Sequence, residues 1–342
     1  MAWAHANSMT IDRVAEPHGI RVALRAIELK LDGTKAAAAT AVRKRAALSA
    51  VLSHAVESQY LPHNPLRDVR RKRQPVEDAV DPRVVVNPEQ ARALLKAVQA
   101  IAPDLHAYFA TIYYAAARPA EARNLRRRDL HLPASGWGRI TLAGSYQERG
   151  AAWTGDGARS EERQLKHRPR KAIGPVPAHP ALVNAFRAHL ATYDTPPDGR
   201  LFVARTGRGG KKLDPPYTEP AGASRIYRVW AAARREALTA EQVASPLAAR
   251  PYDLRHAAVS TWLAAGVAPT QVAEWAGHGV DVLLRVYAKC LDNSEQAALD
   301  RIDAAFSMPS AASSPARRAR MAAEPPPHPR PPSGRGADLH LF

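Results

Sequence analysis

Three residue types that suit attack on a phosphodiester lie close together in the last third of the chain. Tyr287 follows His278 by nine residues, and Arg255 lies just upstream in the run formed by residues 251–256. A tyrosine hydroxyl can serve as a nucleophile, and an arginine can neutralise charge that grows on phosphate oxygens. Most tyrosines are partly buried structural residues, so this interpretation depends on what else the chain supplies.

Two earlier segments carry residues suited to the same chemistry. Arg118 is followed three residues later by Glu121, and Lys166 lies in a basic run with Arg168. Arginine never deprotonates at working pH, so Arg118 and Arg255 together suit the two non-bridging oxygens of a phosphate. Each of these residues also has an ordinary interpretation. The arginines could be surface salt-bridge partners, and His278 could cap the preceding helix. A neighbouring basic residue could take the role of Lys166.

At these residues the chain resembles the tyrosine recombinases, or phage integrase family, and most of all integrases of actinobacterial mobile elements. The family pattern is an arginine with a nearby glutamate, a lysine in a β-turn, a His-x-x-Arg helix start, a Leu-Gly-His turn and a nucleophilic tyrosine. The catalytic residues that the resemblance implies here are Arg118, Lys166, Tyr252, Arg255, His278 and Tyr287. Tyr252 stands where the family usually has histidine; its hydroxyl can donate a hydrogen bond to phosphate but cannot be cationic.

The resemblance implies site-specific recombination between a mobile element and a chromosome. Tyr287 would attack the scissile phosphate to give a 3′-phosphotyrosine, and strand exchange and religation by a 5′ hydroxyl would follow without ATP or metal. Lys166 would be the general acid, His278 would hydrogen-bond the phosphate or assist proton transfer, and Glu121 would orient charged neighbours. The implied partners are double-stranded attachment sites bound by a homo-tetramer, with a dimer on each site, and an accessory directionality factor.

The composition fits a polyanionic partner. The 342 residues include 49 Lys plus Arg against 32 Asp plus Glu, a formal net charge of +17, and each phosphate contact gains affinity by releasing counterions. A basic solvated surface is the ordinary alternative. The candidate DNA-binding residues are Lys44, Arg45, Arg70, Arg71 and Arg168.

The sequence contains no motif typical of several other chemistries. The histidines are scattered, and there is no HExxH, CxxC or acidic cluster, so we predict no metal and no cofactor. The glycine-rich run of residues 206–212 lacks the spacing of a P-loop. No apolar run reaches the length of a membrane helix, no signal peptide is present, and the one cysteine, Cys290, excludes an intrachain disulfide. We expect a cytoplasmic, nucleoid-associated protein.

The periodicities predict a mainly α fold with a small antiparallel β-sheet (α+β), in the manner of a recombinase catalytic domain preceded by a short helical region. Residues 1–33 show few apolar residues at helical spacing, which favours a shortened core-binding domain. The predicted units are a partial helical core-binding (DNA-binding) domain at 1–75, a linker at 76–86, a catalytic integrase domain at 87–306 and a disordered Pro/Arg-rich tail at 307–342.

Local signals predict the elements that must position the site. Asn87 suits an N-cap, Pro88 the first helical position and Gln90 the return bond of a capping box. Helices are expected at 33–59, 104–117, 180–192, 223–237, 252–265, 269–276 and 294–305, with a short one after Pro119. Strands are expected at 136–143, 172–176 and 201–203, with a loop at 150–162.

Three other functions remain open at this point. Residues 252–276 also read as helix, glycine turn, helix, which is typical of a non-catalytic DNA-binding regulator. The short N-terminal side also fits a truncated, inactive integrase remnant. A topoisomerase-like relaxing enzyme would share the tyrosine chemistry without joining two sites.

Overall fold

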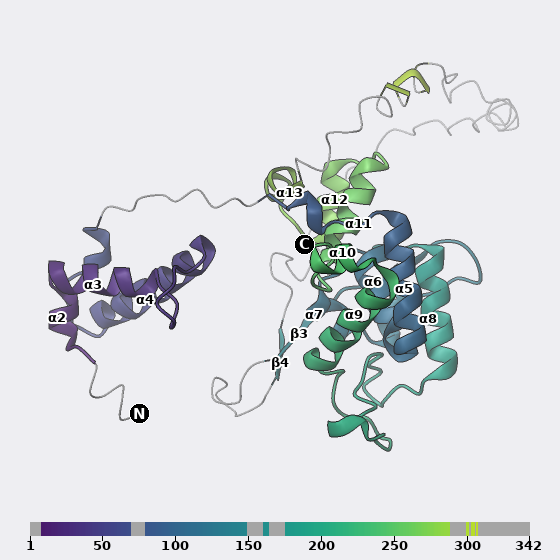
Figure 1. The fold of residues 1–342 in the computed structure, drawn as a ribbon, viewed down its shortest axis with the longest axis horizontal. Helices are drawn as coiled ribbons and strands as arrows, with labels where there is room; N and C mark the ends of the chain where they lie inside the picture. Colours follow the sequence, from purple (N-terminus) through teal and green to yellow (C-terminus); the bar gives the residue numbers. More distant parts are fainter. Residues whose placement is uncertain are drawn as a thin grey trace, which may run out of the picture. The chain divides into compact units, whose positions relative to one another are not determined.

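The computed structural model of the chain describes residues 8–69, 79–148, 160–163, 175–287, 299–300, 302–304 and 306. The chain divides into two compact units, Met1–Asp78 and Ala79–Phe342 (Figure 1). Each unit has its own buried cluster of apolar side chains. The assignment of the first unit as a core-binding domain stays a prediction.

The first unit is helical. Its elements are α2 (Ile11–Ala15), α3 (Pro17–Ile27), α4 (Ala38–Glu57) and the 3-10 turn η1 (Pro65–Arg67). Ile20 of α3 and Leu52 of α4 lie in its core. The helix expected from residue 33 begins later, because Gly33 has a φ of +79° in a turn that closes back onto Lys30. A left-handed residue cannot continue an α-helix.

The second unit holds most of the helices. They are α5 (Pro88–Ile101), α6 (Pro103–Tyr114), α7 (Pro119–Asn124), α8 (Pro180–Thr192), α9 (Ala223–Ala237), α10 (Ala240–Ala244), α11 (Asp253–Ala264), α12 (Pro269–Ala276) and α13 (Val280–Tyr287), with 3-10 turns η2 (Pro82–Val84), η3 (Arg127–Asp129) and η6 (Arg208–Gly210). Asn87 and Gln90 form the expected capping box at the start of α5, with Pro88 at the first helical position. Helix α13 was not predicted from the sequence.

Two small antiparallel sheets accompany the helices. Strands β1 (Leu130–His131), β2 (Gly138–Ile140) and β5 (Val176–Ala178) pair in the order β1-β2-β5, and β3 (Ser145–Glu148) pairs with β4 (Ser160–Arg163). Two expectations are wrong. The loop expected at 150–162 gives way to a strand at Ser160, and residues 201–203 form no sheet strand, since Val203 makes only an isolated bridge with Pro220. Of the strand expected at 172–176, residues 172–174 lie outside the described residues.

The core of the second unit fixes the helices that bear the candidate site. Helix α5 packs against α6 and α9, and α6 packs against α8 and α11 (Figure 1). A second buried cluster joins α11, α12 and α13 and includes Leu263, Val272, Leu283 and Tyr287. The architecture is the mainly helical fold with small antiparallel sheets that the sequence predicted.

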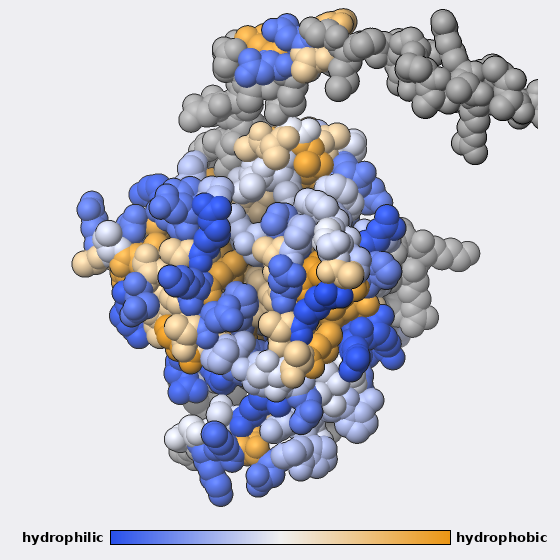
Figure 2. All heavy atoms as spheres, turned by 90° about the vertical axis from the view of Figure 1, so that its right-hand side faces the viewer, coloured by the Kyte–Doolittle hydropathy of each residue, from blue (hydrophilic) through white to orange (hydrophobic). Residues whose placement is uncertain are grey.

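The face of the second unit drawn in Figure 2 is largely hydrophilic, with hydrophobic side chains showing between the polar ones. This pattern is usual for a protein surface, because polar atoms alone cannot cover it. Among the described helices, none is long and apolar enough to cross a membrane.

Candidate active site

Arg118 is fixed in place by the start of α7. It is the residue before Pro119, which takes the first helical position, and Glu121 lies at the third. The backbone N–H of Arg118 donates to Glu121 Oε2 at 2.8 Å, and its guanidinium Nη1 donates to Oε1 at 2.6 Å. The Glu121 side chain is only 2% exposed. One buried carboxylate therefore orients both the backbone and the side chain of Arg118.

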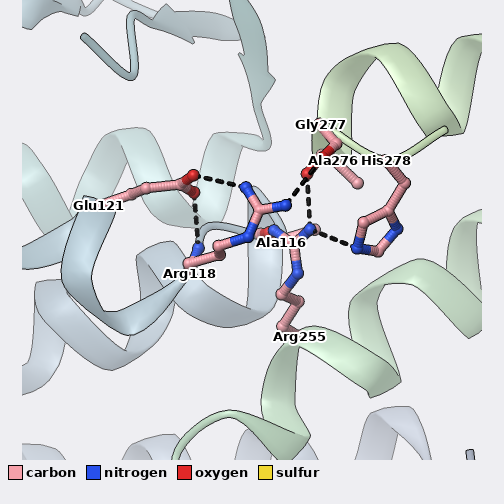
Figure 3. Close-up of polar contacts among 7 residues, drawn as sticks. All are labelled: Ala116, Arg118, Glu121, Arg255, Ala276, Gly277 and His278. Carbon is pink, nitrogen blue, oxygen red and sulfur yellow. Dashed lines mark hydrogen bonds and ion pairs between the residues drawn. The ribbon is translucent and has the colours of Figure 1, made fainter. Parts of the chain in front are cut away.

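The other end of the Arg118 guanidinium reaches the turn after α12. Its Nη2 donates to the carbonyl oxygen of Gly277 at 2.7 Å (Figure 3). Gly277 ends α12 in the left-handed region with φ +66°, where glycine is favoured because it has no Cβ. The N–H of His278 then donates back to the carbonyl of Ala273 at 2.9 Å. This turn directs the Gly277 carbonyl toward Arg118 and carries the backbone on to His278.

Arg255 lies at the start of α11 and is fully buried. Its guanidinium donates to the carbonyl of Ala116, to the carbonyl of Ala276 at 2.5 Å and to His278 Nε2 at 2.8 Å (Figure 3). A guanidinium can only donate, so Nε2 of His278 is the acceptor and carries no proton. Ala116 has a φ of +48°, a strained value for alanine that accompanies its contact with Arg255.

The site carries an excess of positive charge. Burial and the nearby Arg118 guanidinium lower the pKa of Arg255, which shows that the two cations repel each other. Within the described part of the chain, the hydrogen-bond partners of Arg255 are carbonyl oxygens and an imidazole, none of which carries negative charge. A buried charge without a hydrogen-bonded counter-charge is costly, and the Glu121 carboxylate, which is paired with Arg118, offsets that cost only in part. A bound anion between the two guanidiniums would offset that cost.

Tyr287 is the last residue in the described part of α13 and is 1% exposed. Its Oη lies 2.9 Å from Nδ1 of His256, and its ring centroid lies 5.7 Å from that of His256 and 6.1 Å from that of His278. The structure thus brings the predicted tyrosine and the predicted histidine of the turn together with Arg255, which donates to His278. It also adds His256, for which the sequence pattern predicted no role.

His256 is a neutral imidazole near pH 7. Burial lowers its pKa to about 4, with further contributions from the positive charges of Arg255 and Arg250. Its ring meets the Tyr252 ring edge-on at 5.0 Å between centroids. Tyr252 precedes α11, so the residue that stands where the family usually has histidine lies against a histidine one helical turn further on.

The helix that bears Tyr287 is also tied to the beginning of the second unit. The N–H of Val80 donates to the carbonyl of Val286 at 2.8 Å. Val80 and Tyr287 share the same buried cluster. The residue that precedes the candidate nucleophile is therefore held by a segment about two hundred residues earlier in the sequence.

The hairpin that leads toward Lys166 is anchored beside α7. Glu148 of β3 accepts a hydrogen bond from the Arg123 guanidinium at 2.7 Å and another from the N–H of Ala223 at 2.9 Å, at the start of α9. Strand β4 ends at Arg163. Helix α7, which begins next to Arg118, thus also holds the end of β3 at which Glu148 pairs with Ser160.

Several predicted residues are not part of this cluster. Lys166, Arg168, Arg70 and Arg71 lie outside the described residues. Lys44 and Arg45 lie on α4 of the first unit, where they donate to the carbonyls of Leu29 at 2.7 Å and Leu66 at 3.3 Å. Their predicted contact with DNA stays a prediction. No group of three or more His, Cys, Asp or Glu suited to a metal occurs among the residues that the structure describes.

Comparison with known proteins identifies the fold. No family model and no curated protein sequence matches the chain. Among solved structures, the Tn1549 transposon integrase bound to circular intermediate DNA is similar, with a TM-score of 0.52, 18% identity and coverage of 86% of this chain and 87% of that one. The same integrase bound to transposon right-end DNA gives a TM-score of 0.50 at 16% identity, covering 88% and 97% of the two chains. The chain therefore has the tyrosine-recombinase fold that the sequence predicted.

Proposed function

We propose that the chain is a site-specific DNA recombinase in which Tyr287 cleaves one strand by forming a 3′-phosphotyrosine. The observation that supports this most is the cluster of Arg118, Arg255, His278 and Tyr287, which comes from three separate segments. Two of its four residues are arginines whose guanidiniums donate to carbonyl oxygens. The cluster as a whole carries a net positive charge. A phosphodiester is the anion that this arrangement suits best, because a nucleophilic hydroxyl lies beside the same groups.

The residues would act as follows. Arg118 and Arg255 would bind the non-bridging oxygens and stabilise the charge that grows on them in the transition state. Their positions are set before substrate arrives, by Glu121 for one and by the carbonyl of Ala276 for the other. His278, whose Nε2 accepts from Arg255, would hydrogen-bond the phosphate through the proton on its other ring nitrogen, Nδ1. Preorganised charge of this kind costs no rearrangement during the reaction.

The bond energy of the cleaved phosphodiester would be kept in the phosphotyrosine. A free 5′ hydroxyl could then attack the phosphotyrosine and restore the DNA without ATP. Lys166 is proposed as the general acid that protonates the leaving 5′ oxygen; it follows β4 by three residues in the sequence. No step in this scheme calls for a metal ion or a cofactor.

The proposed partner is double-stranded DNA. The net charge of +17 favours a polyanion, and the Tn1549 integrase structures of the same fold contain DNA. Lys44, Arg45, Arg70, Arg71 and Arg168 are proposed as backbone contacts, residues 1–75 as a core-binding domain, and the nucleoid as the place of action. A factor that sets the direction of the reaction would be a further partner.

Assembly on DNA is proposed to be tetrameric, with a dimer on each site. Leu299, Ile302 and Phe306, at helical spacing, are 49%, 50% and 88% exposed. Apolar side chains at such positions form one face of a helix. That face would pack on a neighbouring subunit and so couple cleavage among the protomers.

Covalent capture from a pool of nicked duplexes of randomised sequence tests the proposal. The nick lets the short strand beyond the cleavage point diffuse away, so the phosphotyrosine accumulates and the captured DNA reveals the site. We expect an SDS-resistant protein–DNA species that is lost in Tyr287→Phe. DNA binding without that species would instead support a non-catalytic regulator or an inactive remnant.

The captured site then allows a recombinase to be distinguished from a topoisomerase-like enzyme. Two copies of it on one supercoiled plasmid should recombine if the chain is a recombinase. Relaxation of the plasmid without exchange between the copies would support a topoisomerase-like enzyme.

A further inference from the structure

His256 occupies a position that the proposed function leaves without a role. It follows Arg255 directly and lies one helical turn after Tyr252 on α11. Its Nδ1 is 2.9 Å from the Tyr287 hydroxyl, a hydrogen-bonding distance, and its ring contacts both tyrosine rings. We propose that His256 is a catalytic residue that accepts the proton of Tyr287 during DNA cleavage. This inference rests on the proposed function and adds a residue to it.

The direction of this hydrogen bond depends on which ring nitrogen of His256 carries the proton, and the proposal places that proton on Nε2. A neutral imidazole carries one proton, and the other nitrogen is an acceptor. His256 is neutral near pH 7 because burial and the nearby guanidiniums of Arg255 and Arg250 disfavour its charged form. With the ring proton on Nε2, Nδ1 accepts from the hydroxyl of Tyr287. A tyrosine hydroxyl is a weak nucleophile until such a base takes its proton.

A bound phosphodiester would make His256 a stronger base when it is needed. The charged and titratable groups known to act on it are Arg250, Arg255 and Tyr252 from its own segment and Tyr287 from α13. The charge of Arg255 helps to hold its pKa down. An anion held by Arg255 would offset that charge, since opposite charges nearby favour protonation of an imidazole. Binding of substrate and activation of Tyr287 would thus be linked through one arginine.

The proton balance of the step is simple. As the bond from Tyr287 Oη to phosphorus forms, the hydroxyl proton passes to Nδ1 of His256. The bond from phosphorus to the 5′ oxygen breaks, and that oxygen takes a proton from the general acid, proposed as Lys166. In religation the 5′ hydroxyl gives its proton back to the general acid as its oxygen attacks phosphorus, and the imidazolium of His256 returns its proton to the phenolic oxygen as that oxygen leaves phosphorus.

The same geometry also bears on Tyr252, which stands where the family pattern has histidine. Tyr252 has no imidazole, yet its ring packs on the imidazole of His256. The imidazole missing at position 252 is present four residues later, in contact with the nucleophile.

A direct test observes the imidazole of the unsubstituted chain. The chain would be labelled with ¹⁵N-histidine, and the His256→Asn variant would serve only to assign the two ring nitrogens of His256 by the loss of their signals. We expect an unprotonated Nδ1 and a protonated Nε2 near pH 7. A proton on Nδ1 would make the ring a donor to Tyr287 and would overturn the proposal.

A kinetic test separates proton acceptance from simple support of the fold. The substrate is the captured duplex with sulfur in place of the bridging 5′ oxygen, because a thiolate leaves without a general acid. Single-turnover formation of the covalent species is measured from about pH 6 to about pH 9, the range in which a base of this kind is useful. His256→Ala removes the acceptor, and His256→Asn keeps an acceptor atom that cannot take a full proton.

The variants are expected to differ in cleavage rate and in how steeply that rate changes with pH. The natural chain should cleave at a rate that hardly changes with pH, while His256→Ala should be about 100-fold to 10,000-fold slower near pH 7. The rate of His256→Ala should rise about tenfold per pH unit, because it then depends on the spontaneous ionisation of Tyr287. His256→Asn should fall between them. The buried His189, which bonds the carbonyl of Leu201, provides a matched control: His189→Gln should keep the natural profile.

Other results would contradict the assignment. A His256→Ala rate within about threefold of the natural one, or one reduced equally at every pH, would show that His256 takes no proton in cleavage. If the natural chain formed no covalent species with any duplex of the pool, the proposed function itself would fail and this inference with it.

Discussion

The guanidinium of Arg118 donates to the carbonyl oxygen of Gly277 across 159 positions of sequence, at 2.7 Å. This hydrogen bond joins the start of α7 to the turn that ends α12. The turn also presents the carbonyl of Ala276 to Arg255. The relative placement of the two proposed phosphate-binding arginines is therefore set by two consecutive carbonyls of one helix end.

Substituting Gly277 should disturb this arrangement more than substituting a similar glycine elsewhere. Gly277 and Gly266 have φ values of +66° and +83°, so alanine at either should cost about 1–2 kcal/mol of unfolding free energy. Denaturant titration measures that loss. Only Gly277→Ala should also slow covalent capture of DNA, because only its carbonyl accepts from Arg118. Equal rates for the two variants would show that this carbonyl does not position the arginine.

The two arginines should differ in what they contribute to stability. Arg255→Lys should cost about 1–3 kcal/mol, because an ammonium cannot reach the carbonyls of both Ala116 and Ala276 and leaves a buried acceptor unsatisfied. Arg118→Lys should cost about 1 kcal/mol or less, since the ammonium can keep the charged hydrogen bond to Glu121 and the side chain, 23% exposed, can also reach water. Both should slow single-turnover cleavage by about 100-fold to 1,000-fold. Equal stability losses would contradict the burial argument.

Glu121 should be coupled energetically to Arg118. A double-mutant cycle with Glu121→Gln and Arg118→Ala isolates their interaction, which we expect to be about 1.5–3 kcal/mol for a charged hydrogen bond that is largely shielded from water. Urea unfolding of the four proteins provides the measurement. Arg83 and Asp81 form an exposed pair for comparison, and their cycle should give less than about 1 kcal/mol. Similar interaction energies in the two cycles would show that the burial of Glu121 does not strengthen its hydrogen bond to Arg118.

Much of the site was predictable from the sequence because its residues belong to an ordered pattern. Arg118 with Glu121, Arg255, and His278 with Tyr287 each occur in segments whose order in the chain is specific, and the structure brings them together. The start of α5 was predictable for a local reason, since Asn87, Pro88 and Gln90 each satisfy a known need of a helix end.

Other features were not predicted. Helix α13 follows a glycine turn directly and was missed, although Leu283 and Tyr287 lie four residues apart, a helical spacing, and both are in the core. His256 was visible beside Arg255, but its contact with Tyr287 depends on how α11 and α13 cross. Residues 201–203 look like a strand because Leu201, Phe202 and Val203 are apolar, yet they are buried as a loop within the helical core.

The fold should lose stability in mild acid through His256. Its pKa is about 4 in the folded chain and about 6.5 when unfolded, so the unfolded chain binds the proton more readily. The stability that His256 contributes is present above about pH 6.5 and is lost as the pH falls toward 4, by roughly 3 kcal/mol at about 1.4 kcal/mol per unit. Urea unfolding across this range should show a steeper loss for the natural chain than for His256→Asn. His106, His179 and His189, whose pKa values burial also lowers, are common to both proteins. Parallel curves would contradict the assignment.

The hydrogen bond from Val80 to Val286 gives the entry to the second unit a mechanical significance. Because this bond reaches the backbone one residue before Tyr287, a displacement of Val80 would act directly on the last described turn of α13. The position of the Tyr287 hydroxyl is therefore coupled to a backbone group that is remote from it in sequence and belongs to none of the predicted site residues.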